Sequence, residues 1–245
     1  MENLVKTADL KGLKHELLSS KQFYCWFGLF VVWSLVLMYV FGYLHLIDNP
    51  WYLRGFYEPF LFFIPILVYR PIRTWMKQQW GFRKILELRF YVVFILGLIV
   101  LLLVHYFFYY GMINHAIYYL NGLSEFFLAK TQHDNAAIYQ AWSVILFGSV
   151  IAPICEEVFF RGILMNFLIK KYNLGIGLVI SSTLFAVGHF EFGITRLAAL
   201  AATGVILGLV THYTKSIIPA IIIHGIWNFI SIVLLAHVIS VYQLF

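Results

Sequence analysis

Charged residues are scarce in this sequence of 245 residues. Only 11% are Asp, Glu, Lys or Arg, whereas 62% are hydrophobic, and the mean hydropathy is +0.85. Soluble domains contain about 25% charged and about 45–50% apolar residues. The shortage of charge therefore argues against a soluble enzyme, a disordered chain and a coiled coil. It predicts a protein that is embedded in a lipid bilayer.

Cysteine and clustered basic charge are scarce as well. The two cysteines, Cys25 and Cys155, lie in apolar runs, so a disulfide framework is not expected, and two thiols alone do not form a structural zinc site. The net charge of +6 is small and scattered, which argues against nucleic acid as a partner because that needs a concentrated basic surface. Membrane lipid is the expected partner, since scattered basic flanks suit anionic headgroups.

Long uncharged segments predict the fold. Residues 23–47 exceed the length needed to cross a hydrocarbon layer of about 30 Å, and no ten-residue alternation indicates a membrane β-barrel. Further apolar segments lie at 56–69, 90–112, 138–151, 159–169, 174–192, 197–213 and 217–241. We predict an all-α, polytopic transmembrane bundle of about eight membrane helices. Its expected parts are a polar lead-in at 1–22, N-terminal membrane helices and loops at 23–137, and a helical core at 138–245.

Basic residues leave the orientation open. The segment 70–89 is the densest in basic residues and favours the cytoplasm. If every segment spans, three later lysines fall on the opposite side. They fall on the cytoplasmic side if residues 138–169 form one helix bent at Pro153. If the segment 56–69 does not span the membrane, the three lysines also lie on the cytoplasmic side, but residues 70–89 then lie on the outer side. These lysines are Lys170, Lys171 and Lys215.

Acidic residues almost vanish in the second half of the chain. No aspartate follows Asp134, and the later acids are Glu156, Glu157 and Glu191. An ionisable side chain in hydrocarbon costs at least a few kcal/mol, so it is a candidate functional residue. Glu157 lies four residues before Arg161, so the two share a helical face and can pair. Glu156 points about 100° away and remains available to act on a proton. In the simpler interpretation both acids only begin a helix at the membrane surface.

Two histidine patterns follow in the next apolar segments. Phe185 precedes His189 by four residues, and His224 precedes Asn228 by four, so each pair shares a helical face. Counted from the membrane edges, Glu156, His189 and Asn228 lie at nearly one depth, and His224 lies a turn or more away. The other histidines lack such a partner and are interpreted as interface or loop residues. They are His105, His115, His133, His212 and His237.

Glutamate, histidine and an amide are sufficient for hydrolysis. A glutamate and a histidine can bind and deprotonate a water, and a second histidine with an Asn amide can donate hydrogen bonds to a tetrahedral oxyanion. The same residues could instead form a metal site with a bound water, and the residues alone leave both open. Other intramembrane hydrolases are disfavoured: there is no His-Glu-x-x-His motif, no aspartyl pair and no serine in a Gly-x-Ser-x-Gly context.

The three motifs together resemble a known family. Glu156-Glu157-x-x-x-Arg161, Phe185-x-x-x-His189 and His224-x-x-x-Asn228, in this order, are similar to the CPBP (Abi) family of intramembrane proteases. That family includes CAAX proteases and bacteriocin-processing enzymes and is related to the type II CAAX prenyl endopeptidase. The resemblance covers roughly residues 138–241. In the roles that it implies, Glu156 and His189 activate the water, His224 and Asn228 stabilise the oxyanion, and Glu157 and Arg161 support the site.

The resemblance also implies a function. We expect an intramembrane endopeptidase in a bacterial plasma membrane that cleaves a membrane-associated peptide or protein, in bacteriocin or signal-peptide maturation or in self-immunity. No cofactor is favoured; the alternative is a divalent metal such as zinc held by Glu156, His189 and His224. A second hypothesis is a non-proteolytic immunity or scaffold protein on the same fold. A transporter is weaker, because no inverted repeat is evident. Substrate-binding residues and the oligomeric state are not indicated.

Overall fold

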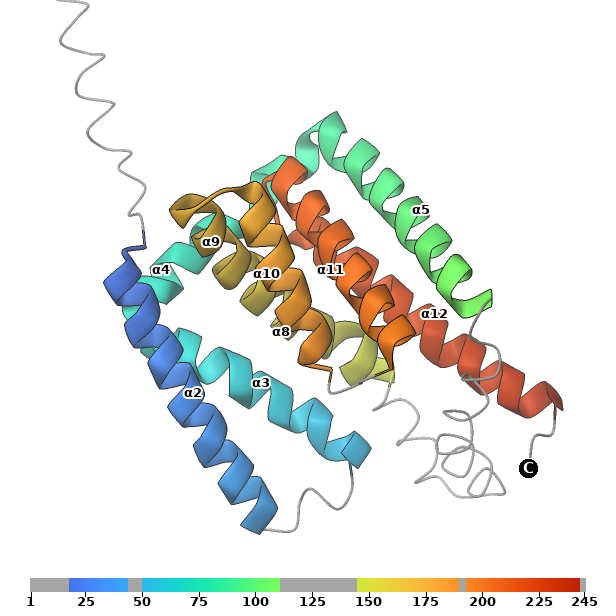
Figure 1. The fold of residues 1–245 in the computed structure, drawn as a ribbon, viewed down its shortest axis with the longest axis horizontal. Coiled ribbons are helices and arrows are strands. Elements are labelled where there is room, and N and C mark those ends of the chain that lie inside the picture. Colours follow the sequence, from blue (N-terminus) through green and yellow to red (C-terminus); the bar gives the residue numbers. More distant parts are fainter. Residues whose placement is uncertain (1–17, 44–49, 111–144, 190–192, 243–245) are drawn as a thin grey trace, which may run out of the picture.

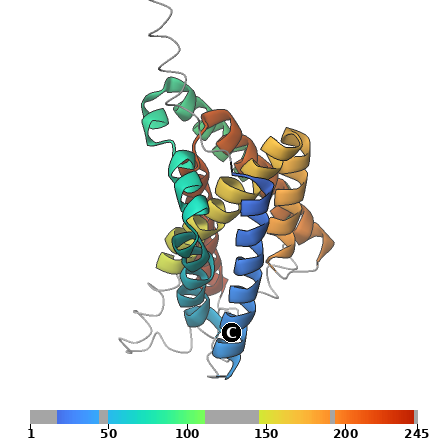
Figure 2. The same ribbon diagram turned by 90° about the vertical axis from the view of Figure 1, so that its left-hand side faces the viewer.

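The computed structural model describes residues 18–43, 50–110, 145–189 and 193–242. These residues form helices joined by short turns, and they include no β-strand (Figures 1 and 2). The predicted all-α helical bundle is therefore confirmed. Most of the polar lead-in and the ends of several predicted segments, such as 138–144 and 190–192, lie outside the described residues.

The N-terminal half supplies two long apolar helices and a helix that lies at one end of the bundle. Many large apolar side chains of α2 and α5 are exposed, as expected for helices that face lipid. The stacked rings of Phe23 and Phe167, 3.8 Å apart, attach α2 to the C-terminal half. The elements are α2 (Ser20–Tyr43), α3 (Pro50–Val68), α4 (Arg70–Gln79), the 3₁₀-helix η2 (Phe82–Leu86) and α5 (Leu88–Tyr110).

Residues 145–171 form one continuous helix, which corrects the prediction of two separate segments at 138–151 and 159–169. Pro153 lies in the first turn of α8 but does not end the helix. A proline ring crowds the carbonyl four residues earlier, and the wider π-helical turn just before it relieves that crowding. The successive parts are the π-helical η3 (Phe147–Ile151), α8 (Ala152–Glu157), the π-helical η4 (Val158–Met165) and α9 (Asn166–Lys171).

Three further helices complete the C-terminal half: α10 (Leu174–Val187), α11 (Ile194–Thr214) and α12 (Ile218–Tyr242). Helix α10 is shorter than the predicted segment 174–192, because it ends before the turn that carries His189. Helices α10 and α11 approach closely at Gly204, where an added Cβ would lie 2.7 Å from the Cβ of Ser182. A glycine is therefore needed for this contact.

Membrane-spanning capacity differs among these helices. Ser20–Val40, Leu88–Phe108 and Ile194–Thr214 are long and apolar enough to cross a bilayer. Shorter apolar helices occupy Pro59–Val68, Leu174–Val187 and Ile218–Ile232. Together they mark an integral membrane protein. Complete crossing by every predicted segment stays a prediction.

The basic residues of the turns lie at one end of the bundle. In Figure 1, η2 and the α9–α10 and α11–α12 turns lie along the upper edge. Helix α4 reaches this edge, because Gln79 bonds to Ile217 and Trp75 lies against Lys170. The basic segment 70–89 therefore lies at the same end as the three later lysines. The sequence left open on which side of the membrane the three lysines lie. Their position at the same end as residues 70–89 is the one expected if a single helix runs through Pro153.

Candidate active site

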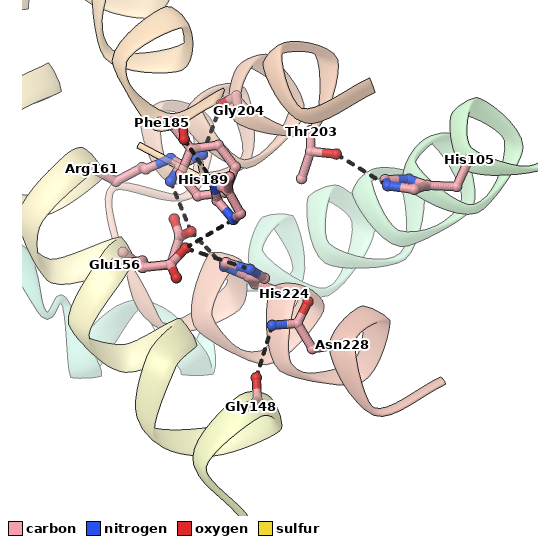
Figure 3. A network of polar contacts seen from close by, with 11 residues as sticks. His105, Gly148, Glu156, Arg161, Phe185, His189, Thr203, Gly204, His224 and Asn228 are labelled. Carbon is pink, nitrogen blue, oxygen red and sulfur yellow. Dashed lines mark hydrogen bonds and ion pairs between the residues drawn. The ribbon is translucent and has the colours of Figure 1, made fainter. Parts of the chain in front are cut away.

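The structure brings one acid and two histidines from three helical segments together (Figure 3). Glu156 lies near the end of α8, His189 in the turn after α10, and His224 in the second turn of α12. Oε2 of Glu156 lies 4.0 Å from Nε2 of His189 and 3.9 Å from Nε2 of His224. Three residues of separate motifs thus meet within one cluster between the helices.

Glu157 and Arg161 form the buried ion pair that their spacing predicted. The guanidinium donates to Oε1 of Glu157 over 2.9 Å, and the side chains are 0% and 1% exposed. Arg161 also donates to the carbonyl of Gly204 and lies 4.4 Å from the centre of the Phe185 ring. A buried pair of charges is tolerated only with such additional partners. The pair therefore joins η4 to α10 and α11.

Glu157 also binds His224. Nδ1 of His224 donates to the same Oε1 atom over 2.9 Å. A carboxylate that already accepts from Arg161 is ionised and can only accept. The proton of a neutral His224 ring therefore lies on Nδ1, and the lone pair lies on Nε2.

Phe185 orients His189 in the same way. Its backbone carbonyl accepts a hydrogen bond of 2.8 Å from Nδ1 of His189, so a neutral His189 ring also carries its lone pair on Nε2. The Phe185 ring makes edge contacts with both imidazoles, with ring centres 4.7 Å from His189 and 5.7 Å from His224. The aromatic residue of the second motif thus positions both histidines.

With both rings neutral, three hydrogen-bond acceptors consequently lie close together. They are the two Nε2 lone pairs and Oε2 of Glu156, a buried oxygen that accepts no hydrogen bond from the described residues. Acceptors that face one another repel unless a donor lies between them. A water molecule is the simplest such donor, because it offers two hydrogens to this group.

His224 lies beside both glutamates, whereas Asn228 bonds to a backbone carbonyl. The Asn228 amide donates to the carbonyl of Gly148 over 2.8 Å, whereas His224 contacts both acids. The depth estimate counted α12 from Ile217. This residue is fully buried, and its backbone N–H donates to the carbonyl of Gln79. The start of α12 therefore lies beneath α4, and the depth of these residues in a bilayer stays a prediction.

His105 also differs from the expectation of an interface or loop position. Its side chain is buried, its Nδ1 bonds to the carbonyl of Leu101, and its Nε2 lies 3.4 Å from the hydroxyl of Thr203. Its ring centre lies 3.7 Å from that of Trp227, one residue before Asn228. Thr203 and Trp227 belong to other helices, so spacing along the chain could not reveal these two partners. His115 and His133 lie outside the described residues, as does the side chain of His237.

The carbonyls of Gly148 and Gly204 were also missed as parts of the site. Each accepts a hydrogen bond from a motif residue, Asn228 and Arg161 respectively. Because every residue has a carbonyl, no sequence signal distinguishes those that take part. Their contribution depends entirely on how closely the helices approach.

The alternative metal site can be tested against the spacing of its donors. Zinc at about 2.0–2.1 Å from three tetrahedral ligands holds the ligand atoms about 3.4 Å apart. The carboxylate–imidazole distances of 3.9 and 4.0 Å are wider. Within the described residues, no group of three His, Cys, Asp or Glu side chains has the arrangement of a metal site. The donors as arranged are therefore spaced more widely than in a zinc site, and the choice between a metal-free and a zinc site stays a prediction.

Comparison with known proteins gives one match. Residues 138–230 match the family model described as Type II CAAX prenyl endopeptidase Rce1-like. No curated protein and no solved structure matches the chain. The match covers well under half of the chain, but it includes every residue of the three motifs. Residues 138–230 are therefore Rce1-like, and the resemblance to CAAX-type intramembrane proteases that the motifs predicted is confirmed.

Proposed function

We propose that this protein is an intramembrane peptidase that hydrolyses a peptide bond with a water held by Glu156 and His189, next to His224. The observation that carries the proposal is that two imidazole nitrogens lie within 4.0 Å of one carboxylate oxygen. The family match supports a peptidase in general. Because the site lies among apolar helices, a membrane-associated peptide or protein is the proposed substrate.

The reaction begins at Glu156. Its carboxylate takes a proton from the water while the water oxygen attacks the carbonyl carbon of the substrate, and His189 holds the water through its Nε2 lone pair. A tetrahedral oxyanion results. The carbon–nitrogen bond then breaks, and Glu156 returns the proton to the leaving amine. The products are a carboxylic acid and an amine, and the acid then gives its remaining proton to the amine, so protons and electron pairs balance.

His224 and Asn228 are the proposed donors to the oxyanion. Nε2 of His224 can donate only when the ring is an imidazolium, and the ionised Glu157 on Nδ1 supplies the counter-charge that such a buried ion requires. Asn228 has two amide hydrogens, and the bond to Gly148 uses one of them. The second hydrogen would serve the oxyanion, which requires a small movement of Asn228 or of the substrate toward it.

Glu156→Gln tests the proposal. The amide keeps the shape of the side chain but cannot take a proton, so we expect peptide cleavage to fall by about 10²–10⁴-fold. The measurement compares the membrane peptides of cells that produce the wild type with those of cells that produce the variant. Peptides cut only in the wild type would identify both the substrate and the cleaved bond.

Glu87→Gln is the matched control, because Glu87 lies at the end of the bundle and pairs with Lys84 there. It should leave the peptide pool unchanged. If equally abundant wild type and Glu156→Gln yield the same peptides, the peptidase proposal fails and the non-proteolytic scaffold hypothesis gains. With a substrate in hand, chelation of the purified enzyme then tests metal dependence. Activity that disappears and returns with one added ion would contradict the metal-free mechanism.

A further inference from the structure

Exposed basic side chains surround the end of the bundle where α4 lies. The acid of this end in the described residues, Glu87, is bound to Lys84 over 2.6 Å. The positive charge of the remaining residues is therefore not compensated. We call this set the cationic rim: Lys21, Arg70, Arg73, Lys77, Arg83, Arg89, Lys170, Lys171 and Lys215.

Helix α4 gives the cationic rim its shape. Ile72, Trp75 and Met76 are buried against the bundle, whereas three basic residues of the same helix are exposed. A short helix with one buried apolar face and one basic face is typical of an element that lies in the membrane interface. The exposed residues are Arg70, Arg73 and Lys77.

Apolar and aromatic side chains accompany the basic ones. Phe82, Leu86 and Leu88 are 65–88% exposed next to Arg83 and Arg89. A surface in water rarely exposes such residues in a row, but a surface that enters the headgroup region does.

Several rim cations also lie over aromatic rings. The ammonium of Lys170 lies 3.8 Å from the centre of the Trp75 ring, and that of Lys171 lies 4.9 Å from the Tyr24 ring. Aromatic residues at the headgroup level, with basic side chains that extend from them, are characteristic of membrane interfaces.

We propose that the cationic rim binds the headgroups of anionic phospholipids. Uncompensated basic charge supplies the attraction to phosphate, and the exposed apolar residues between the cations require a bilayer and not a dissolved anion. The leaflet of a plasma membrane that is rich in anionic lipid faces the cytoplasm. The cationic rim therefore also assigns that side to this end of the bundle.

Bound lipid would act on the candidate active site through α4. Nε1 of Trp75 donates to the carbonyl of Gly162, one residue after Arg161. Gln79 accepts from the side chain of Asn166 and from the backbone of Ile217, just before α12. Headgroups that hold α4 in place thus also hold the helices that carry Arg161 and His224.

The test compares the purified full chain in nanodiscs of phosphatidylcholine with nanodiscs of phosphatidylcholine and phosphatidylglycerol. We expect the midpoint of thermal unfolding to rise by several degrees in the anionic discs and to lose this gain at high salt. Native mass spectrometry should show phosphatidylglycerol retained on the protein above its share in the disc. Equal midpoints together with no enrichment would overturn the proposal.

A triple variant, Arg70→Gln, Arg73→Gln and Lys77→Gln, should lose most of the gain and most of the retained lipid. The matched control, Lys84→Gln with Glu87→Gln, removes two charges of the same end without changing the net charge, and it should keep both. A triple variant that retains as much phosphatidylglycerol as the wild type would contradict the proposal. So would inorganic phosphate that reproduces the gain in phosphatidylcholine discs, since the ligand would then be a dissolved anion.

Discussion

Helix α2 and the helix at 145–171 are both apolar membrane helices, but they differ in where their polar side chains find hydrogen-bond partners. In α2 the hydroxyl of Ser34 donates to a carbonyl of its own helix, and large side chains such as Val32 and Tyr39 are exposed. In the helix at 145–171, Glu157 and Arg161 are buried and bond to residues of α11 and α12. Hydropathy alone identifies both as membrane helices. Buried charged side chains with partners on other helices identify the one that carries the site.

Arg161→Met should produce the largest difference in stability between the two helices. It leaves the carboxylate of Glu157 buried with His224 as its remaining partner, and breaking a buried pair in this way costs about 3–5 kcal/mol. Lys21→Met, at the exposed start of α2, should change the free energy of unfolding by less than about 0.5 kcal/mol. Unfolding in detergent measures both.

A double variant sharpens this prediction. Arg161→Met with Glu157→Met replaces both charges by apolar groups, so it should be more stable than Arg161→Met alone. If the double variant loses as much stability as the sum of both single variants, the two residues do not act as a pair, and the contrast with α2 is weaker than we infer.

Glycine-to-alanine changes compare the packing around the partners of Arg161 with the packing around α2. At Gly204 the new methyl group would meet Ser182 of α10, including its Cα at 2.8 Å, and overpacking of this kind costs about 1–3 kcal/mol. At Gly28 of α2 nothing lies within 4 Å. Gly28→Ala should therefore be neutral or gain up to about 1 kcal/mol from the better helix propensity of alanine. Thermal unfolding midpoints in one detergent would reveal the opposite signs, and equal losses would contradict the comparison.

Replacement of two tryptophans should give the smallest changes in stability. Trp75 donates to Gly162 over 3.1 Å and lies beneath Lys170, whereas Trp33 donates to Phe60 over 2.9 Å between α2 and α3. Replacement by phenylalanine removes one hydrogen bond in each case, worth about 0.5–1.5 kcal/mol. Trp75→Phe should cost slightly more, because phenylalanine also binds a cation less strongly. If Trp33→Phe lowers the free energy of unfolding more than Trp75→Phe does, the contact between α2 and α3 contributes more to stability than the exposure of α2 indicates.

The sequence predicted well those features that depend on spacing within one helix. The apolar runs identified the bundle, and the four-residue spacing of Glu157 and Arg161 predicted a pair that the structure contains. The four-residue spacing in the second motif likewise corresponds to the bond between His189 and the carbonyl of Phe185. Such contacts follow from helical geometry before any tertiary packing is known.

Features that depend on packing between helices could not be predicted in this way. The contacts of His224 with both glutamates depend on how α12 packs against α8. Besides the carbonyl of Leu101 in its own helix, His105 has partners on α11 and α12, more than ninety positions away along the chain. The continuity of the helix through Pro153 depends on a π-helical turn, for which the residues 147–151 carry no recognisable signal.

The π-helical stretches on either side of Glu156 have a consequence for relatives of this protein. A π-helical turn accommodates one residue more than an α-helical turn does. A homologue that lacks one residue within 147–151 or 158–165 could therefore wind that stretch as ordinary α-helix and still aim its two glutamates at the same neighbours. We expect alignments of such homologues to place single-residue gaps inside this helix, where gaps are normally penalised, and not in the turns that flank it.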